Sequence, residues 1–135
     1  MVFVLEASVT TTWAFDDESD PVADAARDLM ATESATVPSL WWYEVRNALL
    51  MGERRGRLRP SNTAYVLEQL SDLPITIDPG LDETTIFRLA RRHNLTFYDA
   101  SYLALALRRR APLATLDRAL IAAARAEGVG LVGHG

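Results

Sequence analysis

Two aspartates stand where helices are expected to begin, positions from which a fold can present an acid to a ligand. Asp99 lies at the mouth of an apolar helix expected over 100–107, and Asp117 follows the short apolar segment 113–116. In an open parallel sheet, ligands bind outside the carboxyl ends of the strands, and Asp117 lies at such an end. Taken alone, each aspartate is explained more simply as a helix N-cap, a position that Asp favours.

Two glutamates extend this acidic set. Glu6 stands at the end of the apolar run 2–5, which has the length and composition of a strand buried on both faces. Glu44 lies inside an otherwise apolar helix, where a buried carboxylate needs a partner or a metal ion. The polar residues that follow Glu44 are equally compatible with a surface position, so the pattern leaves both interpretations open.

The chemistry of such a set is that of a hard divalent cation. Three of the acids follow elements that are expected to share one edge of a sheet, and carboxylates gathered there repel one another unless a cation neutralises them. Oxygen-only ligands select Mg²⁺ or Mn²⁺. Such an ion lowers the pKa of a bound water and stabilises the charge that builds on a phosphate during in-line displacement. The four acids therefore favour metal-assisted cleavage of a phosphodiester.

Composition narrows the class of protein. The 135 residues include no Cys, which excludes disulfides and thiolate metal sites. We expect a cytoplasmic protein with no membrane segment, since the sequence shows no secretion signal and no apolar run near the roughly 18 residues of a membrane span. All 14 basic residues are Arg, which excludes lysine Schiff-base chemistry and a P-loop. The net charge of −4 leaves room only for a local nucleic-acid footprint.

The densest basic cluster follows the helix that carries Glu44. Arg54, Arg55 and Arg57 lie within four residues of one another, and Arg59 follows them. Arg matches phosphate oxygens with two parallel hydrogen bonds, so this cluster is a candidate RNA contact. A solvated helix end is the alternative explanation.

Strands and helices alternate along the chain. Apolar runs of strand length predict strands near 2–5, 36–37, 74–77, 113–116 and 129–132. Helical spacing predicts helices near 21–34, 40–52, 61–70, 81–93, 100–107 and 117–127. This alternation predicts an α/β fold with a parallel sheet of four to five strands, flanked by helices on both faces, in a single domain over 1–135.

Three consecutive aromatics, Trp41, Trp42 and Tyr43, stand near the start of the helix expected over 40–52. Trp42 recurs with Val45 and Leu49 at helical spacing, which predicts that this face is buried. Because a helix turns about 100° per residue, three successive rings cannot all face one core. At least one ring is expected to point outward or into a second copy of the chain.

Four segments carry a family resemblance, and they span nearly the whole chain. They read FVLEASV, VPSLWWYEVRNALL, LTFYDASYLALALRRRAPLATLD and RALIAAARAEGVGLV. In this order they resemble PIN-domain proteins, specifically the toxins of bacterial VapBC toxin-antitoxin systems. The resemblance implies a PIN fold and a toxin that acts as a Mg²⁺- or Mn²⁺-dependent endoribonuclease. It also implies a homodimer, and a hetero-oligomer with a small VapB-like antitoxin.

The same resemblance assigns the residues of the site. Carried over position by position, the acidic metal-binding and catalytic set falls on Glu6, Glu44, Asp99 and Asp117. The supporting hydroxyls fall on Ser8 and Thr115. The chain departs from the family at one of these positions, because the family normally has Asp where this chain has Glu6.

Two other classes of function are alternatives to a nuclease. A degenerate PIN-like binding module would hold RNA or a partner with weakened or no cleavage, with Glu6 as the cause. A receiver-like phosphoacceptor domain has a similar size and layout. Receiver domains use a Lys, however, and this chain contains none.

Overall fold

A parallel sheet runs through the middle of the protein in the computed structural model, which describes residues 1–134. Its strands are β1 (Val2–Leu5), β2 (Ser34–Pro38), β3 (Ile75–Asp78) and β4 (Leu113–Ala114), in the order β3-β2-β1-β4. Strands β1 and β2 therefore lie inside the sheet with neighbours on both sides. This position explains the unbroken apolar run of β1, since an inner strand of a parallel sheet is buried on both faces.

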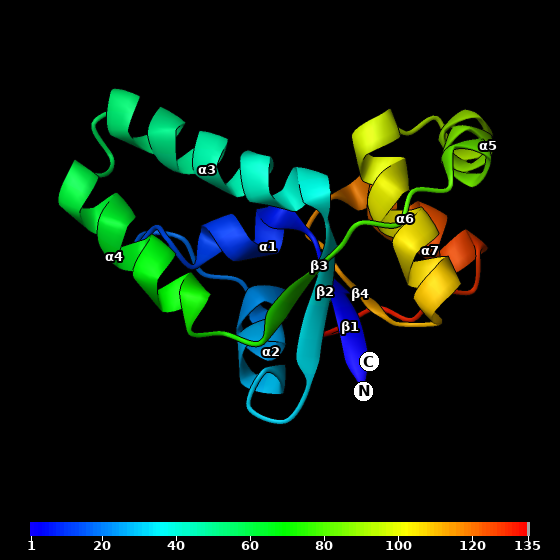
Figure 1. Ribbon diagram of the computed structural model, residues 1–135, viewed down its shortest axis with the longest axis horizontal. Helices are drawn as coiled ribbons and strands as arrows, with labels where there is room; N and C mark the ends of the chain where they lie inside the picture. The colour runs from blue at the N-terminus through cyan, green and yellow to red at the C-terminus, as the bar shows by residue number, and fades with distance from the viewer. Residues whose placement is uncertain (135) are drawn as a thin grey trace.

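Helices cover both faces of the sheet, and Figure 1 shows them as two groups on either side of the strands. One group contains α1 (Ala7–Thr12), α2 (Pro21–Leu29), α3 (Ser39–Arg54) and α4 (Pro60–Ser71). The other contains α5 (Glu83–His93), α6 (Phe97–Arg109) and α7 (Arg118–Ala126). The expected α/β fold with a parallel sheet and helices on both faces is thus confirmed.

Helix α6 is the buried centre of its layer. Every residue from Ala100 to Ala106 is buried, because α5 and α7 pack against α6 and its inner face lies on β1 and β2. Its amino end begins earlier than expected, at Phe97, where the Thr96 side chain caps the first turn. The buried helix holds its first turn, and with it Asp99, at a fixed place over the sheet.

The local structure differs from the sequence predictions at several places. The strand expected over 129–132 is a single bridge between Leu113 and Leu131, because β4 is too short to pair with a longer neighbour. Helix α1 was not predicted, since its ASVTTT sequence has no helical apolar repeat and is set by the cap at Glu6. The buried face of α3 holds Trp41, whereas Trp42 is 41% exposed.

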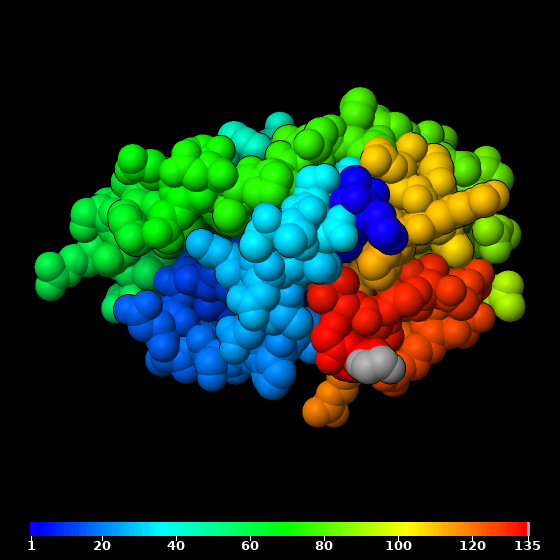
Figure 2. All heavy atoms as spheres, turned by 90° about the horizontal axis from the view of Figure 1, so that it is seen from below, coloured from blue at the N-terminus to red at the C-terminus, as the bar shows by residue number. Residues whose placement is uncertain are grey.

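The amino ends of the strands form the opposite face of the molecule from the acids. Figure 2 looks onto this face and shows the start of the chain beside the segment that leads into β2. There the N-terminal ammonium of Met1 pairs with Glu33 at 2.8 Å. Among residues 1–134, no helix is long and apolar enough to cross a membrane.

Candidate active site

The four predicted acids come from four elements that meet at the carboxyl end of the sheet. Strand β1 pairs with β4 in parallel, with Leu5 opposite Ala114, so the residues that follow these strands leave at the same edge. Glu6 follows β1 and caps α1, and Asp117 caps α7. The amino ends of α3 and α6, which carry the other two acids, face each other across this edge in Figure 1.

Glu6 is buried, and both of its carboxylate oxygens accept hydrogen bonds. Its Oε2 accepts the backbone N–H of Ser8 at 2.7 Å, as an N-cap does. Its Oε1 accepts the hydroxyls of Ser8 at 2.6 Å and Thr115 at 2.7 Å. The two hydroxyls that the family resemblance assigns as supports thus both contact this carboxylate. The same network fixes the start of α7, since Thr115 Oγ1 accepts the N–H of Asp117 at 3.1 Å.

Glu44 is half-buried, so neither extreme considered from the sequence describes it. Burial raises the pKa of Glu44, and the negative charges of Glu6 and Asp99 raise it further. A hydrogen bond from the Tyr102 hydroxyl to Glu44 Oε1, at 2.6 Å, acts in the opposite direction on this pKa. The site therefore disfavours the charged form of Glu44.

Tyr102 is a site residue that the sequence reasoning missed. Its side chain is fully buried, its hydroxyl donates to Glu44, and the backbone of Ala7 also faces that hydroxyl. The available signal was its spacing from Asp99, since residues three apart on a helix share a face. Tyr102 thus links α6 to the helix that carries Glu44 and to the start of α1.

The two aspartates differ in their local roles. Asp117 is an N-cap, and its Oδ1 accepts the N–H of Leu120 at 2.8 Å. Asp99 is not a cap, because the Thr96 hydroxyl caps α6 and accepts the N–H of Asp99 at 3.0 Å. Burial raises the pKa of Asp99, and the charges of Asp117 and then Glu6 add to this effect. The capping explanation therefore accounts for Asp117 alone.

The donor set has the chemistry of a hard-cation site but not a closed arrangement. All four side chains offer carboxylate oxygens, which suit Mg²⁺ or Mn²⁺, and none of them forms an ion pair with an Arg in the part of the chain that the structure describes. Within residues 1–134, however, no three acids or histidines stand close enough together to hold an ion as they are placed. Glu6 contributes to this, since its oxygens are turned toward Ser8 and Thr115.

A shallow groove of about 380 Å³ opens beside Glu44. Its lining residues come from α3 and α6, and they are Leu40, Tyr43, Glu44, Asn47 and Tyr98. A larger hollow of about 500 Å³, bordered by the 13–17 segment and α4, contains none of the four acids. The groove at Glu44 is thus the hollow that adjoins the candidate site.

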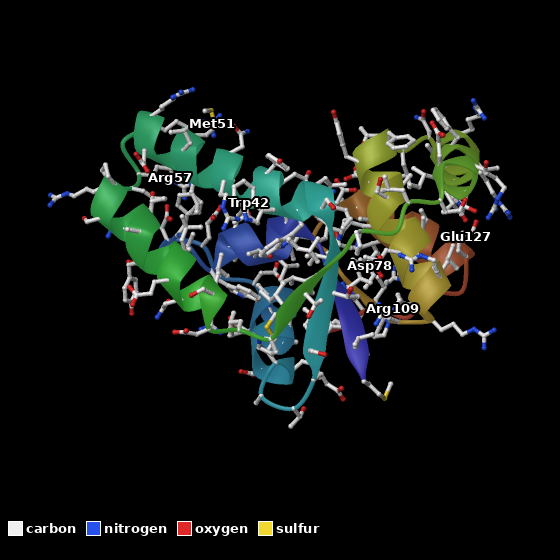
Figure 3. The ribbon with its side chains drawn as sticks, viewed as in Figure 1. Trp42, Met51, Arg57, Asp78, Arg109 and Glu127 are labelled. Carbon is white, nitrogen blue, oxygen red and sulfur yellow. The ribbon has the colours of Figure 1, made fainter. Side chains whose placement is uncertain are left out.

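The basic cluster predicted as an RNA contact lies far from the acids. Arg54 stands ten residues after Glu44 on α3, which corresponds to about 15 Å along the helix. Figure 3 shows Arg57 at the far tip of the hairpin formed by α3 and α4. Arg57 donates to Asp17 at 2.9 Å and stacks over Phe15, so its guanidinium is already engaged. Arg54 and Arg55 are exposed at the same tip.

Comparison with known families decides the class of this fold and site. Residues 3–126 match the PIN domain family, which is nearly the whole chain. The chain is a PIN domain. The acids at the carboxyl edge of its sheet are those that the family resemblance assigns, and this PIN domain presents them from β1, α3, α6 and the start of α7.

Curated relatives place this PIN domain near the VapC proteins. It is 34% identical over 123 residues to Ribonuclease VapC3 of Pyrobaculum aerophilum, covering 89% of this chain and 92% of that protein. It is 37% identical over 91 residues to Exonuclease VapC9 of the same organism, covering 67% of each. The chain is therefore a VapC-like PIN domain.

A solved structure supports the fold alone. The crystal structure of PAE2754 from Pyrobaculum aerophilum superposes with a TM-score of 0.72 at 24% sequence identity. The match covers 91% of this chain and 84% of the other. The parallel sheet with helices on both faces is thus shared with that protein.

Proposed function

We propose that this PIN domain is the toxin of a type II toxin-antitoxin system and cleaves RNA as a metal-dependent endoribonuclease. The observation that carries the proposal is the convergence of four carboxylates without cationic partners among residues 1–134. Burial and mutual repulsion raise the pKa of Glu44 and Asp99, which is the electrostatic state that a bound cation relieves. The similarity to Ribonuclease VapC3 supports RNA as the substrate.

The residues that would hold the ion are Glu6, Glu44, Asp99 and Asp117. When bound, Mg²⁺ or Mn²⁺ supplies charge stabilisation at the phosphate and an activated water. The chain itself orients the acids: Ser8 and Thr115 hold Glu6, and the Tyr102 hydroxyl holds Glu44. Each of these contacts fixes a carboxylate before substrate arrives, which reduces the reorganisation required during the reaction.

The partners follow from the same assignment. A VapB-like antitoxin would inhibit the toxin in a hetero-oligomer, and the toxin would act in the cytoplasm as one domain over 1–135. A homodimer is part of this proposal, because Trp42 is 41% exposed on α3. The exposed Arg54 and Arg55, with Arg57, remain candidates for contacts to an RNA strand that extends along α3.

A nuclease assay tests the proposal. The full chain, freed of metal with EDTA and dialysed, should cleave a single-stranded RNA only after Mn²⁺ or Mg²⁺ is added. The Asp117→Asn variant, prepared identically, is the control for contaminating ribonucleases, because Asn keeps the helix cap and removes the charge. Cleavage that persists in excess EDTA, or equally in the variant, would contradict the metal mechanism.

A degenerate binding module is the second candidate, and the placement of Glu6 favours it. Both Glu6 oxygens accept hydrogen bonds from within the protein, and Mg²⁺ demands near-ideal octahedral geometry at about 2.0 to 2.1 Å from its ligands. Asp is one bond shorter, roughly 1.5 Å. If Glu6 weakens the site, Glu6→Asp should bind Mn²⁺ more tightly and cleave faster. Equal affinities and rates for both proteins would mean that Glu6 is an adapted ligand.

A further inference from the structure

A matched pair of exposed tyrosines borders the acidic site. Tyr43 directly precedes Glu44 and is 69% exposed, and Tyr98 directly precedes Asp99 and is 63% exposed. They belong to α3 and α6, whose amino ends face each other across the carboxyl edge of the sheet. The two proposed catalytic acids that lie within helices, Glu44 and Asp99, are thus each preceded by a tyrosine that is exposed to solvent.

The two rings line one groove together with a polar side chain. This is the groove of about 380 Å³ beside Glu44, which lies within the roughly 300 to 1,000 Å³ typical of small-molecule sites. Asn47 lines it as well, one helical turn after Tyr43. Among residues 1–134, neither tyrosine hydroxyl nor the Asn47 amide has a hydrogen-bond partner. The groove therefore offers flat apolar faces and unused donors and acceptors.

The Tyr43 ring is held in place before any ligand binds. Trp42 contacts it edge to face with ring centroids 5.0 Å apart. Arg46 lies over the Trp42 ring at 3.8 Å and donates to the Trp42 carbonyl at 3.1 Å. A ring restrained in this way loses little conformational freedom on binding, which favours affinity.

We infer that the groove of Tyr43, Asn47 and Tyr98 is a binding site for an unpaired nucleobase of the RNA strand. This inference rests on the proposed function, because the groove shares Glu44 with the acidic site. A strand whose phosphodiester bond lies at the acids extends past Glu44, so a neighbouring base reaches the groove. Single-stranded RNA is bound by stacking of bases on aromatic rings and by hydrogen bonds to base edges. In this groove the two tyrosine rings supply the stacking and the Asn47 amide supplies the hydrogen bonds.

The lining chemistry favours a base over an apolar protein surface. A second copy or a protein helix would place apolar side chains against Asn47 and the Glu44 carboxylate, which would leave polar groups without partners. A base presents its own donors and acceptors at its edge and keeps its π faces for the rings. If a second copy of the chain covers this groove instead, the experiment below gives a different result.

The experiment measures RNA binding in the full chain carrying Asp117→Asn, which prevents cleavage under the proposed function. Fluorescence anisotropy with a labelled single-stranded RNA, in Mn²⁺ buffer, gives the dissociation constant. Tyr98→Ala and Tyr43→Ala should each weaken binding by roughly 5- to 100-fold, the usual loss of one base–aromatic stack. Tyr98→Phe should keep the affinity within about twofold, because the ring remains. Tyr65→Ala, which removes an equally exposed tyrosine from α4, is the matched control.

An abasic RNA distinguishes stacking from a general loss of structure. Moving one abasic nucleotide along the strand finds the position whose base occupies the groove. With the abasic nucleotide at that position, the parent protein and Tyr98→Ala should bind the RNA equally tightly. Equal affinity of the tyrosine variants and Tyr65→Ala for intact RNA would overturn the nucleobase site and leave the nuclease proposal standing. A smaller oligomer in sedimentation with unchanged RNA affinity would assign the groove to a second copy. No RNA binding by any of these proteins would overturn both proposals.

Discussion

Carboxylates at two places along the same sheet edge have opposite surroundings. Asp78, the last residue of β3, accepts hydrogen bonds from the guanidinium groups of Arg108 at 2.9 Å and Arg109 at 3.1 Å. Figure 3 shows Asp78 and Arg109 side by side. The hydrogen bond from Arg108, with smaller contributions from Gly80 and Arg109, holds its pKa below the usual range. The pKa of Asp99 is instead raised, because burial and other acids surround it.

The difference separates a structural carboxylate from one available to a ligand. Asp78 has its charge balanced within the fold, where it ties β3 to the end of α6. Asp99, Glu44 and their neighbours keep an unbalanced negative charge at the carboxyl ends of β1 and β4. Such a cluster costs stability when it is empty, and proteins retain such costs mostly at functional sites.

Neutralising an acid in each place should give opposite results. Asp99→Asn should reduce RNA cleavage roughly 100-fold or more, since it removes charge that stabilises the reaction, while its melting temperature stays equal or rises as repulsion falls. Asp78→Asn should leave cleavage unchanged and lower the melting temperature. Cleavage rates and thermal unfolding of both variants check this. Equal cleavage by Asp99→Asn and the parent protein would place the chemistry elsewhere.

A divalent cation should act on only one of the two places. Mn²⁺ at about 100 times its dissociation constant should stabilise the fold by roughly 2.7 kcal/mol, because it binds the folded state alone. Asp78→Asn should keep this stabilisation and Asp99→Asn should lose most of it. Thermal unfolding with and without Mn²⁺, using NaCl of equal ionic strength as the reference, makes the measurement. An unchanged melting temperature of the parent protein would count against an ion site.

Removing the Tyr102 hydroxyl should weaken the acidic site without removing an acid. Tyr102→Phe leaves Glu44 Oε1 without its donor, and the loss of such an orienting contact should reduce Mn²⁺ affinity roughly tenfold. Calorimetric titration of Mn²⁺ measures this, with Tyr65→Phe as the control on the exposed face of α4. Unchanged affinity would mean that Tyr102 serves packing alone.

The pH dependence of stability should have opposite signs at the two places when metal is chelated. Because the folded pKa of Asp78 is lowered from 3.8, its stabilisation is present above pH 3.8 and is lost as pH falls through the folded pKa. The folded pKa of Asp99 is raised from 3.8, so stability is lost as pH rises from 3.8 through that value. Each effect should be small, about 1 kcal/mol or less for Asp78, whose Arg partners are partly exposed.

The free energy of unfolding of the parent protein and the two variants, measured from about pH 2.5 to about pH 7, isolates the contributions of Asp78 and Asp99. Asp78→Asn should show less destabilisation on the acid side than the parent protein. Asp99→Asn should lose less stability than the parent protein as the pH rises above 3.8, the value from which the pKa of Asp99 is raised in the parent protein. Identical profiles for all three proteins would remove the electrostatic contrast between the two places.

The acids themselves were predictable because their positions follow from strand ends and helix starts. An apolar run followed by Glu6, and a second followed by Asp117, is enough to place both at one edge once the sheet is parallel. The contacts of those acids were not predictable in the same way. The hydrogen bond from Thr115 to Glu6 spans 109 residues of sequence, and it depends on which strands are neighbours.

The errors in the sequence reasoning share a physical cause. Trp41 and Trp42 are equally apolar, and the buried ring, Trp41, is the one whose indole N–H has a partner in the core: it donates to the Thr10 hydroxyl at 2.9 Å. The predicted strand near the C-terminus had the right composition, but β4 offers only two residues for pairing. The local sequence pattern indicates whether a segment forms a helix or a strand. The residues packed against it in the fold determine which face is buried and how long the element is.

The pairing of β1 with β4 also bears on when the site can form during synthesis. Val4 pairs with Leu113, so the strand that carries the first acid lacks one neighbour until the last quarter of the chain is made. Contacts so distant in sequence form late, since a long loop must close first. A growing chain on the ribosome thus has Glu6, Glu44 and Asp99 but no β4 to support them. Under the proposed function, a nascent chain would therefore become able to cleave RNA only after β4 and Asp117 have been synthesised.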